Sequence, residues 1–353
     1  MIYTFLTRIG DYSVSSNSSI RVAFYGCGNF AKTTRIPNLL QIDNVNIIAA
    51  CDSNKETLEE NAKQFNIPQV YHTDNGGAKA MLESEDFEVL YSIVPAYVRT
   101  DVEVIAAEKG IHIFSEKPQA LTMKVANRID NAIRNAGVIS TVGFRERYRP
   151  IFQTARDFLS DKEIIHVRFQ SFGGLPPVAG SEAKTWWADM EKSGGRALDW
   201  GVHATDYSRF MTGLNISYSQ AFYCERPSYS TPLSCIFNYR FENGATMNLN
   251  FVSAGSNPKN EPWFTVFYEG GCLTIYQYDR IEVNGEMFYR AEEFNPWLEQ
   301  DKTYIRAIRT GNAELLQSDY HDGLYSLAPV LAGWESARKN GVCMDLDIFM
   351  DDH

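Results

Sequence analysis

An aspartate and a histidine stand four residues apart in residues 193–206, where the pattern predicts a helix. In a helix, Asp199, His203 and Asp206 share one face, so the Asp199 carboxylate can orient the His203 imidazole and tune its basicity. Because histidine titrates near about pH 6.5, His203 suits removal of a proton from an alcohol. Two alternatives stay open: a structural hydrogen-bond network, and a metal site formed by the same three side chains.

A lysine ends another apolar stretch, in the triplet Glu116-Lys117-Pro118. The preceding residues predict a strand of a parallel sheet, and open α/β sheets hold ligands at the carboxyl ends of their strands. At that edge Lys117 can hydrogen-bond a substrate hydroxyl and stabilise negative charge on its oxygen, while Pro118 fixes the backbone direction. An ordinary surface lysine at a strand end is the alternative.

Glycines mark a third segment, which reads Gly26-Cys27-Gly28-Asn29-Phe30-Ala31 between a predicted strand and a predicted helix. This is the G-x-G-x-x-A pattern of dinucleotide-binding proteins in the context that the pattern requires. The glycines permit a tight turn and close approach of the backbone to a pyrophosphate, and Ala31 lets helix and strand pack closely. We therefore predict that the loop binds a dinucleotide, with a turn that binds no ligand as the alternative.

The next predicted strand ends at Asp52, 24 residues beyond Gly28. A carboxylate at this place can hydrogen-bond the hydroxyls of an adenosine ribose and repel a 2′-phosphate, which favours NAD over NADP. Lys55 is close to Asp52 in the sequence, so NADP stays open as a cofactor. In the alternative interpretation, Asp52 or Ser53 is the N-cap of the following helix.

The elements that must position these residues alternate between strand and helix through the first part of the chain. The predicted strands cover residues 20–26, 45–52, 89–95, 111–118 and 138–144, and the predicted helices cover 31–42, 55–65, 98–109 and 122–136. Such alternation implies parallel βαβ units with right-handed crossovers. We therefore expect residues 20–143 to form an α/β domain with a doubly wound parallel sheet.

After Arg149 the pattern changes to longer strands and a long loop. We predict helices at 150–159, 197–211, 297–309 and 320–339, a strand at 163–172, a loop rich in Gly, Pro and Trp at 173–195, and a β-rich region at 216–289 with hairpin turns at 242–244, 269–271 and 284–285. Residues 144–346 are therefore expected to form an α+β domain on a mostly antiparallel open sheet, which binds substrate and mediates oligomer contacts.

The composition fits a folded protein of about two domains, with 353 residues, 44% hydrophobic and 22% charged. The 33 basic and 44 acidic residues give a net charge of −11, which argues against nucleic acid and anionic membranes as partners. Six cysteines without a C-x-x-C pair indicate reduced thiols and a cytoplasmic location. We expect a flexible leader at residues 1–19 and a solvated acidic tail at 347–353.

Taken together and in order, these segments resemble those of the glucose–fructose oxidoreductase, inositol dehydrogenase and rhizopine-catabolism (Gfo/Idh/MocA) family over residues 20–346. The similar pieces are the glycine loop, Glu116-Lys117-Pro118, Val142-Gly143-Phe144 with Arg147 following, Gly194-Gly195 with Asp199, His203 and Asp206, and Asp322-Gly323 with Ser336-Ala337-Arg338. The resemblance implies a Rossmann domain followed by an α+β domain whose open sheet often makes oligomer contacts. It also implies that Lys117 contacts the substrate hydroxyl and the nicotinamide, that His203 is the acid/base, and that Asp199 binds a substrate hydroxyl or supports His203.

The chain departs from the family at Pro95-Ala96-Tyr97, which keeps a proline but lacks the asparagine that often follows it. Arg196 replaces a third glycine and either stands at the pocket mouth or faces solvent. Trp186 and Trp187 either stack on a sugar ring or form a buried structural pair. The predicted cofactor-binding residues are Gly26, Gly28, Asn29, Phe30, Ala31, Asp52, Pro95, Glu116 and Lys117. The predicted substrate-binding residues are Tyr97, Lys117, Arg147, Trp187, Asp199 and His203, and no metal ligand is expected.

These observations predict an NAD(P)-dependent oxidoreductase that transfers a hydride between nicotinamide and a secondary hydroxyl of a sugar, polyol or sugar derivative. NAD is the expected cofactor, with NADP as the other choice. One alternative is NAD-dependent glycoside cleavage by oxidation and elimination, in which the cofactor is recycled internally. Another is a dinucleotide-sensing regulator without catalysis. A sheet rich in aromatic residues, among them Phe222, Phe237 and Phe251, predicts a homodimer or homotetramer.

Overall fold

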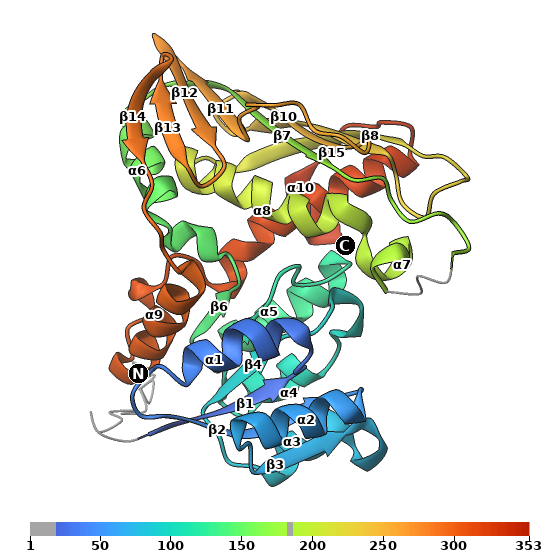
Figure 1. Cartoon of the computed structure of the whole chain (residues 1–353), viewed down its shortest axis with the longest axis vertical. Coiled ribbons are helices and arrows are strands. Elements are labelled where there is room, and N and C mark those ends of the chain that lie inside the picture. The colour runs from blue at the N-terminus through green and yellow to red at the C-terminus, as the bar shows by residue number, and fades with distance from the viewer. Residues whose placement is uncertain (1–18, 182–185, 353) are drawn as a thin grey trace, which may run out of the picture.

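The first sheet is built from short runs of Val, Ile, Ala and Phe, as expected for a parallel sheet with helices on both faces. Its six strands are parallel and lie in the order β3-β2-β1-β4-β5-β6 (Figure 1). They are β1 (Ile20–Tyr25), β2 (Val45–Asp52), β3 (Gln69–His72), β4 (Val89–Ser92), β5 (His112–Ser115) and β6 (Ser140–Val142). This computed structural model describes residues 19–181 and 186–352, so the predicted leader, apart from Ser19, lies outside the described residues.

The strand order reverses between β1 and β4, and in α/β sheets a ligand binds outside the carboxyl ends of the strands at such a point. The helices of this domain are α1 (Ile36–Leu39), α2 (Lys55–Phe65), α3 (Gly77–Ser84), α4 (Val102–Glu108) and α5 (Met123–Ala136). A π-helical turn, Ala31–Arg35, precedes α1, and in it the Ile36 N–H donates to the Ala31 carbonyl. The single continuous helix predicted over residues 31–42 is therefore widened near its start.

The second sheet has nine strands in the order β14-β13-β12-β11-β7-β10-β9-β8-β15. They are β7 (Ile164–Gly173), β8 (Ile216–Cys224), β9 (Ser234–Phe241), β10 (Thr246–Ser253), β11 (Phe264–Tyr268), β12 (Gly271–Tyr276), β13 (Arg280–Val283), β14 (Glu286–Arg290) and β15 (Met344–Asp345). The three predicted turns join antiparallel pairs, so the mostly antiparallel sheet is confirmed. One pair, β7 with β10, is parallel, which makes the sheet mixed.

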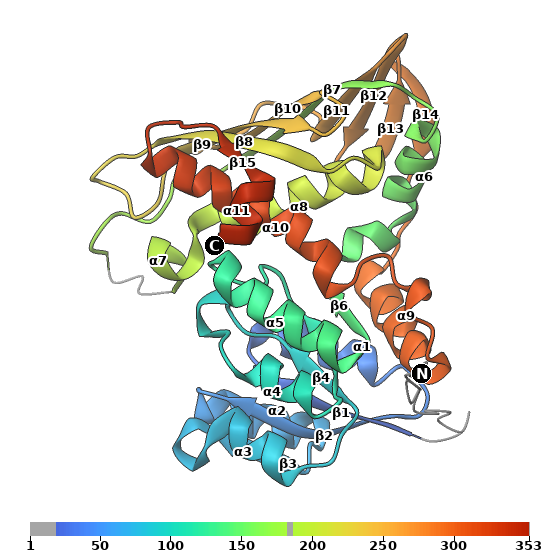
Figure 2. The ribbon, with the colours of Figure 1, turned by 180° about the vertical axis from the view of Figure 1, so that it is seen from behind.

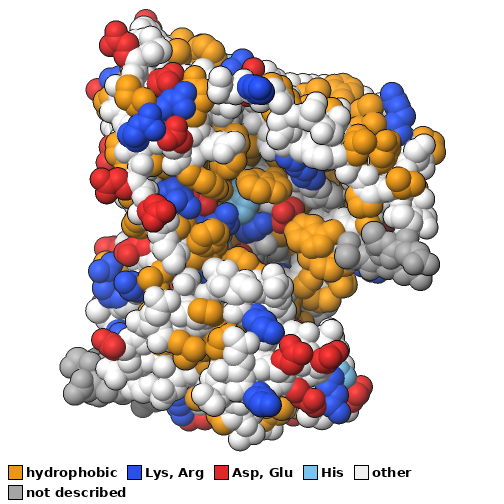
Figure 3. Space-filling view, viewed as in Figure 1, with side chains coloured by type: hydrophobic (Ala, Val, Ile, Leu, Met, Phe, Trp, Pro, Cys, Tyr) orange, Lys and Arg blue, Asp and Glu red, His pale blue; other side chains and the backbone are white. Residues whose placement is uncertain are grey.

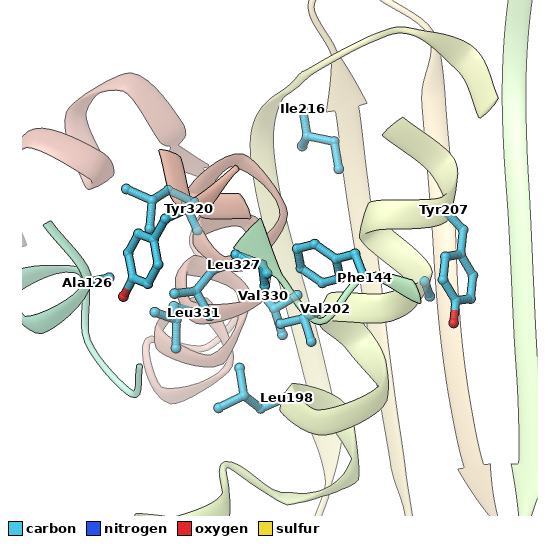
Figure 4. Close-up of a cluster of buried hydrophobic side chains, with 14 of the residues drawn as sticks. Ala126, Phe144, Leu198, Val202, Tyr207, Ile216, Tyr320, Leu327, Val330 and Leu331 are labelled. Atoms are coloured by element: carbon cyan, nitrogen blue, oxygen red, sulfur yellow. The ribbon is translucent and has the colours of Figure 1, made fainter. Parts of the chain in front are cut away.

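Helices cover one face of this sheet and separate it from the first domain (Figure 1). They are α6 (Pro150–Leu159), α8 (Gly195–Thr212), α10 (Tyr320–Arg338) and α11 (Leu346–Asp352), while the short α7 (Met190–Ser193) packs against α8. In the core, Leu198 and Val202 of α8 face Leu327, Val330 and Leu331 of α10 (Figure 4). This packing fixes α8, and with it the residues predicted to do chemistry.

The aromatic residues of the second sheet divide between its two faces. Phe237 and Phe251 are buried beneath the helices, whereas Phe222 is exposed on the chain's surface. The aliphatic Ile165 of the same sheet is exposed as well. The aromatic content that suggested an oligomer therefore belongs largely to the core. The homodimer or homotetramer stays a prediction, and the exposed apolar side chains are the part of the sheet that still favours it.

The chain returns to the first domain after the second sheet. Helix α9 (Pro296–Thr310) places Tyr304, Ile305 and Ile308 in the same buried cluster as the side chains of β1 and β2. From behind, α10 and α11 lie next to α5 (Figure 2). The two domains are therefore joined through packed helices as well as through the segment that follows β6.

The segment expected to be a solvated acidic tail, residues 347–353, belongs to α11 as far as Asp352, and its Asp347 and Asp351 are exposed. Met344–Asp345 pairs with β8 as β15, and α11 follows it. Leu346 and Phe349 are 2% and 5% exposed, because their spacing of three residues puts both on the face of α11 that meets the core. The acidic side chains that suggested solvation occupy other positions on this short helix.

A buried arginine connects the start of α1 with the end of β5 and with α9. Arg35 is fully buried, and its guanidinium donates to Glu116 at 2.6 and 3.0 Å and to Asp301 at 2.9 Å. It also lies 4.3 Å from the centre of the Phe114 ring. Burial raises the pKa of Asp301 to about 6, although the Arg35 charge opposes that rise. This network ties Glu116, the residue before Lys117, to α9.

Replacing Arg35 by Met leaves Glu116 and Asp301 as buried carboxylates without their shared cation. We expect the free energy of unfolding to fall by about 3–5 kcal/mol, as for other buried pairs that lose one partner. Urea unfolding measures the change. The control, Lys32→Met, removes an exposed pair with Glu60 and is expected to change stability by less than about 1 kcal/mol. Equal losses in the two variants would contradict a structural role for the network.

Candidate active site

A cleft of about 520 Å³ opens between the two domains at the carboxyl ends of the first sheet. In Figure 3 the face between the domains is hollowed, and hydrophobic side chains gather there with Lys, Arg and His. The cleft is lined by the glycine loop and the ends of β4 and β5 on one side, and by α8 and the preceding loop on the other. Of the predicted site residues, those that line it are Gly28, Asn29, Phe30, Ala31, Pro95, Glu116, Lys117, Trp187, Asp199 and His203.

The two glycines of the loop are required for different reasons. Gly26 has φ +88°, and a Cβ there would lie 2.5 Å from the Ile93 carbonyl oxygen, so the turn itself needs glycine. A Cβ on Gly28 would meet no protein atom within 4 Å. Among the described residues no side chain caps the helix start at Phe30, so its first N–H groups are available to an anion. The loop therefore fits a dinucleotide pyrophosphate passing over Gly28.

Asp52 lies beside the glycine loop, at the end of β2. Its carboxylate accepts hydrogen bonds from the backbone N–H groups of Cys27 and Asn54, both at 2.8 Å. The helix that follows is capped by Asn54, whose side chain accepts from the Thr57 N–H, so the N-cap alternative for Asp52 and Ser53 is wrong. Asp52 therefore lies at the end of β2, where its carboxylate could accept hydrogen bonds from the hydroxyls of an adenosine ribose. It does not line the cleft itself.

The strand-end lysine meets the second domain. Lys117 Nζ donates to Asp199 Oδ1 at 2.6 Å, and both side chains are largely buried, at 14% and 16% exposure. Since an ammonium has three donors, at least one N–H of Lys117 is left for a ligand. Glu116 lines the cleft too, but its carboxylate accepts from Arg35. The structure therefore excludes the alternative of an ordinary surface lysine.

The expected contact between Asp199 and His203 is not formed. His203 Nδ1 has no hydrogen-bond partner among the described residues, and the Asp199 carboxylate binds Lys117 instead. The two residues do share the cleft side of α8, as their spacing predicted. The prediction that Asp199 and His203 face the same way was therefore correct. The Asp199 carboxylate nevertheless binds the Lys117 ammonium, because a charged donor attracts a carboxylate more strongly than a neutral imidazole does.

His203 is almost completely buried, with Nε2 3.5 Å from Arg145 NH1. A guanidinium can only donate, so this contact favours the neutral imidazole with its lone pair on Nε2. Burial, and then the charges of Lys117 and Arg145, lower the pKa of His203 well below its ordinary value. The ring of His203 is therefore held as a neutral base at the cleft.

Two of the predicted residues belong to a structural cluster away from the cleft. Arg147 donates to the Asp206 carboxylate at 2.6 and 3.1 Å and also lies 2.7 Å from Asp322. Asp206 is fully buried and accepts from Ser326 as well. Arg147 therefore does not line the cleft, and its guanidinium is held by carboxylates of the protein. Within the described part of the chain, no three His, Cys, Asp or Glu side chains are grouped to hold a metal ion.

The aromatic loop before α8 forms one end of the cleft. Trp186 and Trp187 stack with ring centres 4.0 Å apart, and both line the cleft, with Trp187 46% exposed. Tyr97 lies 6.2 Å from the Trp186 ring but is outside the lining, so it stands at the rim. Arg196 is neither at the mouth nor in solvent, because it donates to Ser171 Oγ and the Phe172 carbonyl, both at 2.8 Å.

Among the cleft residues that sequence reasoning missed, four have charged or aromatic side chains: Arg145, Lys192, Trp200 and Trp297. Arg145 and Trp200 each stand next to or near a predicted residue in the chain, and nothing in their local pattern distinguishes them. Trp297 comes from α9, 85 residues beyond the end of α8 at Thr212, and the centre of its ring lies 4.5 Å from the Arg145 guanidinium. Such a contact depends on the return of α9 to the first domain.

No helix in the described part of the chain is long and apolar enough to cross a membrane. Sequence comparison finds D-apiose dehydrogenase of Paraburkholderia graminis, 28% identical over 60% of this chain and 55% of that protein. It also finds scyllo-inositol 2-dehydrogenase (NAD(+)) of Bacillus subtilis, 24% identical over 56% of this chain and 55% of that protein. The chain thus matches little more than half the length of these relatives.

An oxidoreductase from Thermotoga maritima has the same fold, with a TM-score of 0.80, 21% identity, and coverage of 94% of this chain and 99% of the other. Two family sequence models also match. Residues 20–144 match the oxidoreductase family with an NAD-binding Rossmann fold, and residues 152–274 match the GFO/IDH/MocA C-terminal domain. The chain therefore belongs to the Gfo/Idh/MocA oxidoreductases, a family of NAD(P)-dependent sugar and inositol dehydrogenases, and its first domain is the NAD-binding Rossmann domain.

Proposed function

We propose that the protein is an NAD-dependent dehydrogenase that acts on a secondary hydroxyl of a sugar, polyol or sugar derivative. The observation that carries this proposal is the meeting of the Lys117–Asp199 pair and the neutral His203 in one cleft, next to the glycine loop. A regulator that senses a dinucleotide does not need a base and an ammonium at the same hydroxyl. The relatives' sugar and inositol substrates support the same class.

Each residue has a distinct part in the proposed reaction. His203 Nε2 accepts the proton of the substrate hydroxyl, and Lys117 donates a hydrogen bond to the same oxygen as negative charge grows on it. Asp199 holds the Lys117 ammonium in place. NAD, when bound, would supply the acceptor for a hydride from the alcohol carbon. The backbone of the glycine loop would hold the pyrophosphate, and Asp52 the adenosine ribose.

The proposed function is tested by absorbance at 340 nm, with NAD and NADP supplied separately against inositols, free sugars, sugar acids and simple glycosides. We expect sustained NADH formation with one class and a preference for NAD, since Asp52 disfavours a 2′-phosphate. Sugar release from a glycoside without net NADH would instead support cleavage with a recycled cofactor. Bound NAD with neither reaction would support a sensor.

Gly28→Ala adds a methyl group at the place where the cofactor must pass but where no protein atom lies within 4 Å. We expect an unchanged melting temperature and NADH binding weakened by at least about tenfold, which fluorescence titration measures. Gly26→Ala is the matched comparison, and because of the clash with Ile93 it should lower the melting temperature itself. Unaltered NADH affinity in the Gly28 variant would argue against this route for the pyrophosphate.

Lys117→Met and His203→Asn remove the oxyanion donor and the base. Each is expected to lower kcat by about 10²–10⁴-fold, the range for a lost general base or electrostatic stabiliser, while NADH binding persists. Steady-state kinetics and NADH titration measure the two effects. The control is His166→Asn, which changes a histidine hydrogen-bonded to Thr246 on the second sheet, away from the cleft. Full turnover in either test variant refutes the assigned roles.

The lowered pKa of His203 sets the direction of the pH dependence. Burial and two cations disfavour its protonated form, so the base stays available as pH falls through its ordinary value. We expect kcat/KM for oxidation to stay level down to about pH 6.5 and to fall only below it. Arg145→Gln removes one cation and should move the acidic limb to higher pH. A limb above pH 6.5 in the unaltered protein would contradict this account.

A further inference from the structure

The guanidinium of Arg145 is a cleft cation that lacks a full set of partners. Its side chain is 14% exposed, and Nε lies 3.0 Å from the carboxylate of the adjacent Glu146. NH1 lies 3.5 Å from His203 Nε2, and among the described residues neither terminal nitrogen donates a hydrogen bond to a carboxylate. The buried guanidiniums of Arg35 and Arg147, by contrast, place terminal nitrogens on Asp301 and Asp206.

The carboxylate nearest to Arg145 is shared with a second cation. Glu146 serves two cations, because the Arg149 Nε donates to it at 2.5 Å while Arg145 approaches its other oxygen. Lys117 pairs with Asp199, Lys192 with Asp189, and Glu116 shares Arg35 with Asp301. His203 adds no charge, since its imidazole is neutral. Arg145 is therefore a cleft cation whose terminal nitrogens meet no carboxylate among the described residues.

We propose that Arg145 binds a carboxylate of the substrate, so that the substrate is a sugar acid rather than a neutral sugar or polyol. This inference rests on the proposed dehydrogenase function. Arg145 offers a planar pair of donors, with its guanidinium carbon 4.5 Å from the centre of the Trp297 ring, and such a fork matches the two oxygens of a carboxylate. The aromatic side chains of Trp200 and Trp297, which line the cleft with Arg145, exclude water from the guanidinium, and an ion pair is stronger where water is excluded.

The distance between Arg145 and His203 also limits where the carboxylate stands in the substrate. A carboxylate oxygen on NH1 and a hydroxyl oxygen on Nε2 each lie about 3 Å from their partners, and those partners are 3.5 Å apart. The two substrate oxygens are therefore at most about 9.5 Å apart, a distance that limits the substrate to a small sugar acid. Aldonic and uronic monosaccharides meet this limit.

Matched substrate pairs test the inference: D-glucose against D-glucuronate and D-gluconate, and D-galactose against D-galacturonate and D-galactonate, each with NAD. We expect kcat/KM to favour at least one acid by about 10- to 100-fold, the range for hydrogen bonds to a charged group. Arg145→Gln should remove most of that preference through KM, and Arg145→Lys should keep part of it. The matched control is Arg149→Gln, which removes the other cation on Glu146 but does not line the cleft, and should leave the preference intact.

A second readout does not depend on turnover. Trp200 and Trp297 line the cleft, so binding of an acid to the NADH-loaded protein should quench tryptophan fluorescence, and Arg145→Gln should weaken this response. Quenching by acids without NADH formation supports the carboxylate site and contradicts the dehydrogenase assignment. NADH formation from neutral sugars alone overturns the carboxylate site and leaves the dehydrogenase standing. Preference for D-glucose 6-phosphate over every acid, or no binding of any acid, also overturns it.

Discussion

The buried charge of Arg35 holds together the parts on which the site depends. Its guanidinium is placed by the π-helical turn after the glycine loop, and it joins Glu116 at the end of β5 to Asp301 in α9. Because the pair is fully buried, its geometry must be satisfied on all sides for the fold to be stable. One side chain thus fixes the nucleotide loop, the end of β5 that precedes Lys117, and α9.

Charge pairing fixes the side chains to which the proposed function assigns a part at the substrate hydroxyl. Lys117 is drawn to Asp199 across the domain boundary, which gives the ammonium a fixed direction without neutralising all of its donors. Burial and the positive charges of Lys117 and Arg145 keep the His203 imidazole neutral, because they lower its pKa. A base and a hydrogen-bond donor therefore coexist a short distance apart, although in water an unhindered lysine and histidine would have no fixed relation.

Local patterns were sufficient for the fold and for part of the site. Alternating apolar runs indicate the parallel sheet, and the spacing of Gly26, Gly28 and Ala31 indicates the nucleotide loop, because both depend on neighbours in the chain. The partners of Asp199 and Arg147 could not be obtained in that way. Helical spacing puts Asp199 beside His203, but the tertiary fold brings Lys117, which follows the end of β5, to the Asp199 carboxylate. Arg147 and Arg145 are two residues apart, and the turn at Arg145–Tyr148 decides which one enters the cleft.

The return of α9 has a thermodynamic consequence. The same helix carries Trp297, on which the Arg145 guanidinium lies, and Asp301, which binds Arg35 at the nucleotide helix. If cofactor binding shifts α9 at Asp301, Trp297 shifts as well, because the two residues are about one turn apart in the same helix. The Arg145 guanidinium, which contacts the Trp297 ring, then moves too. The affinities for nucleotide and for the second ligand are then linked, and by reciprocity each ligand changes the affinity for the other by the same factor.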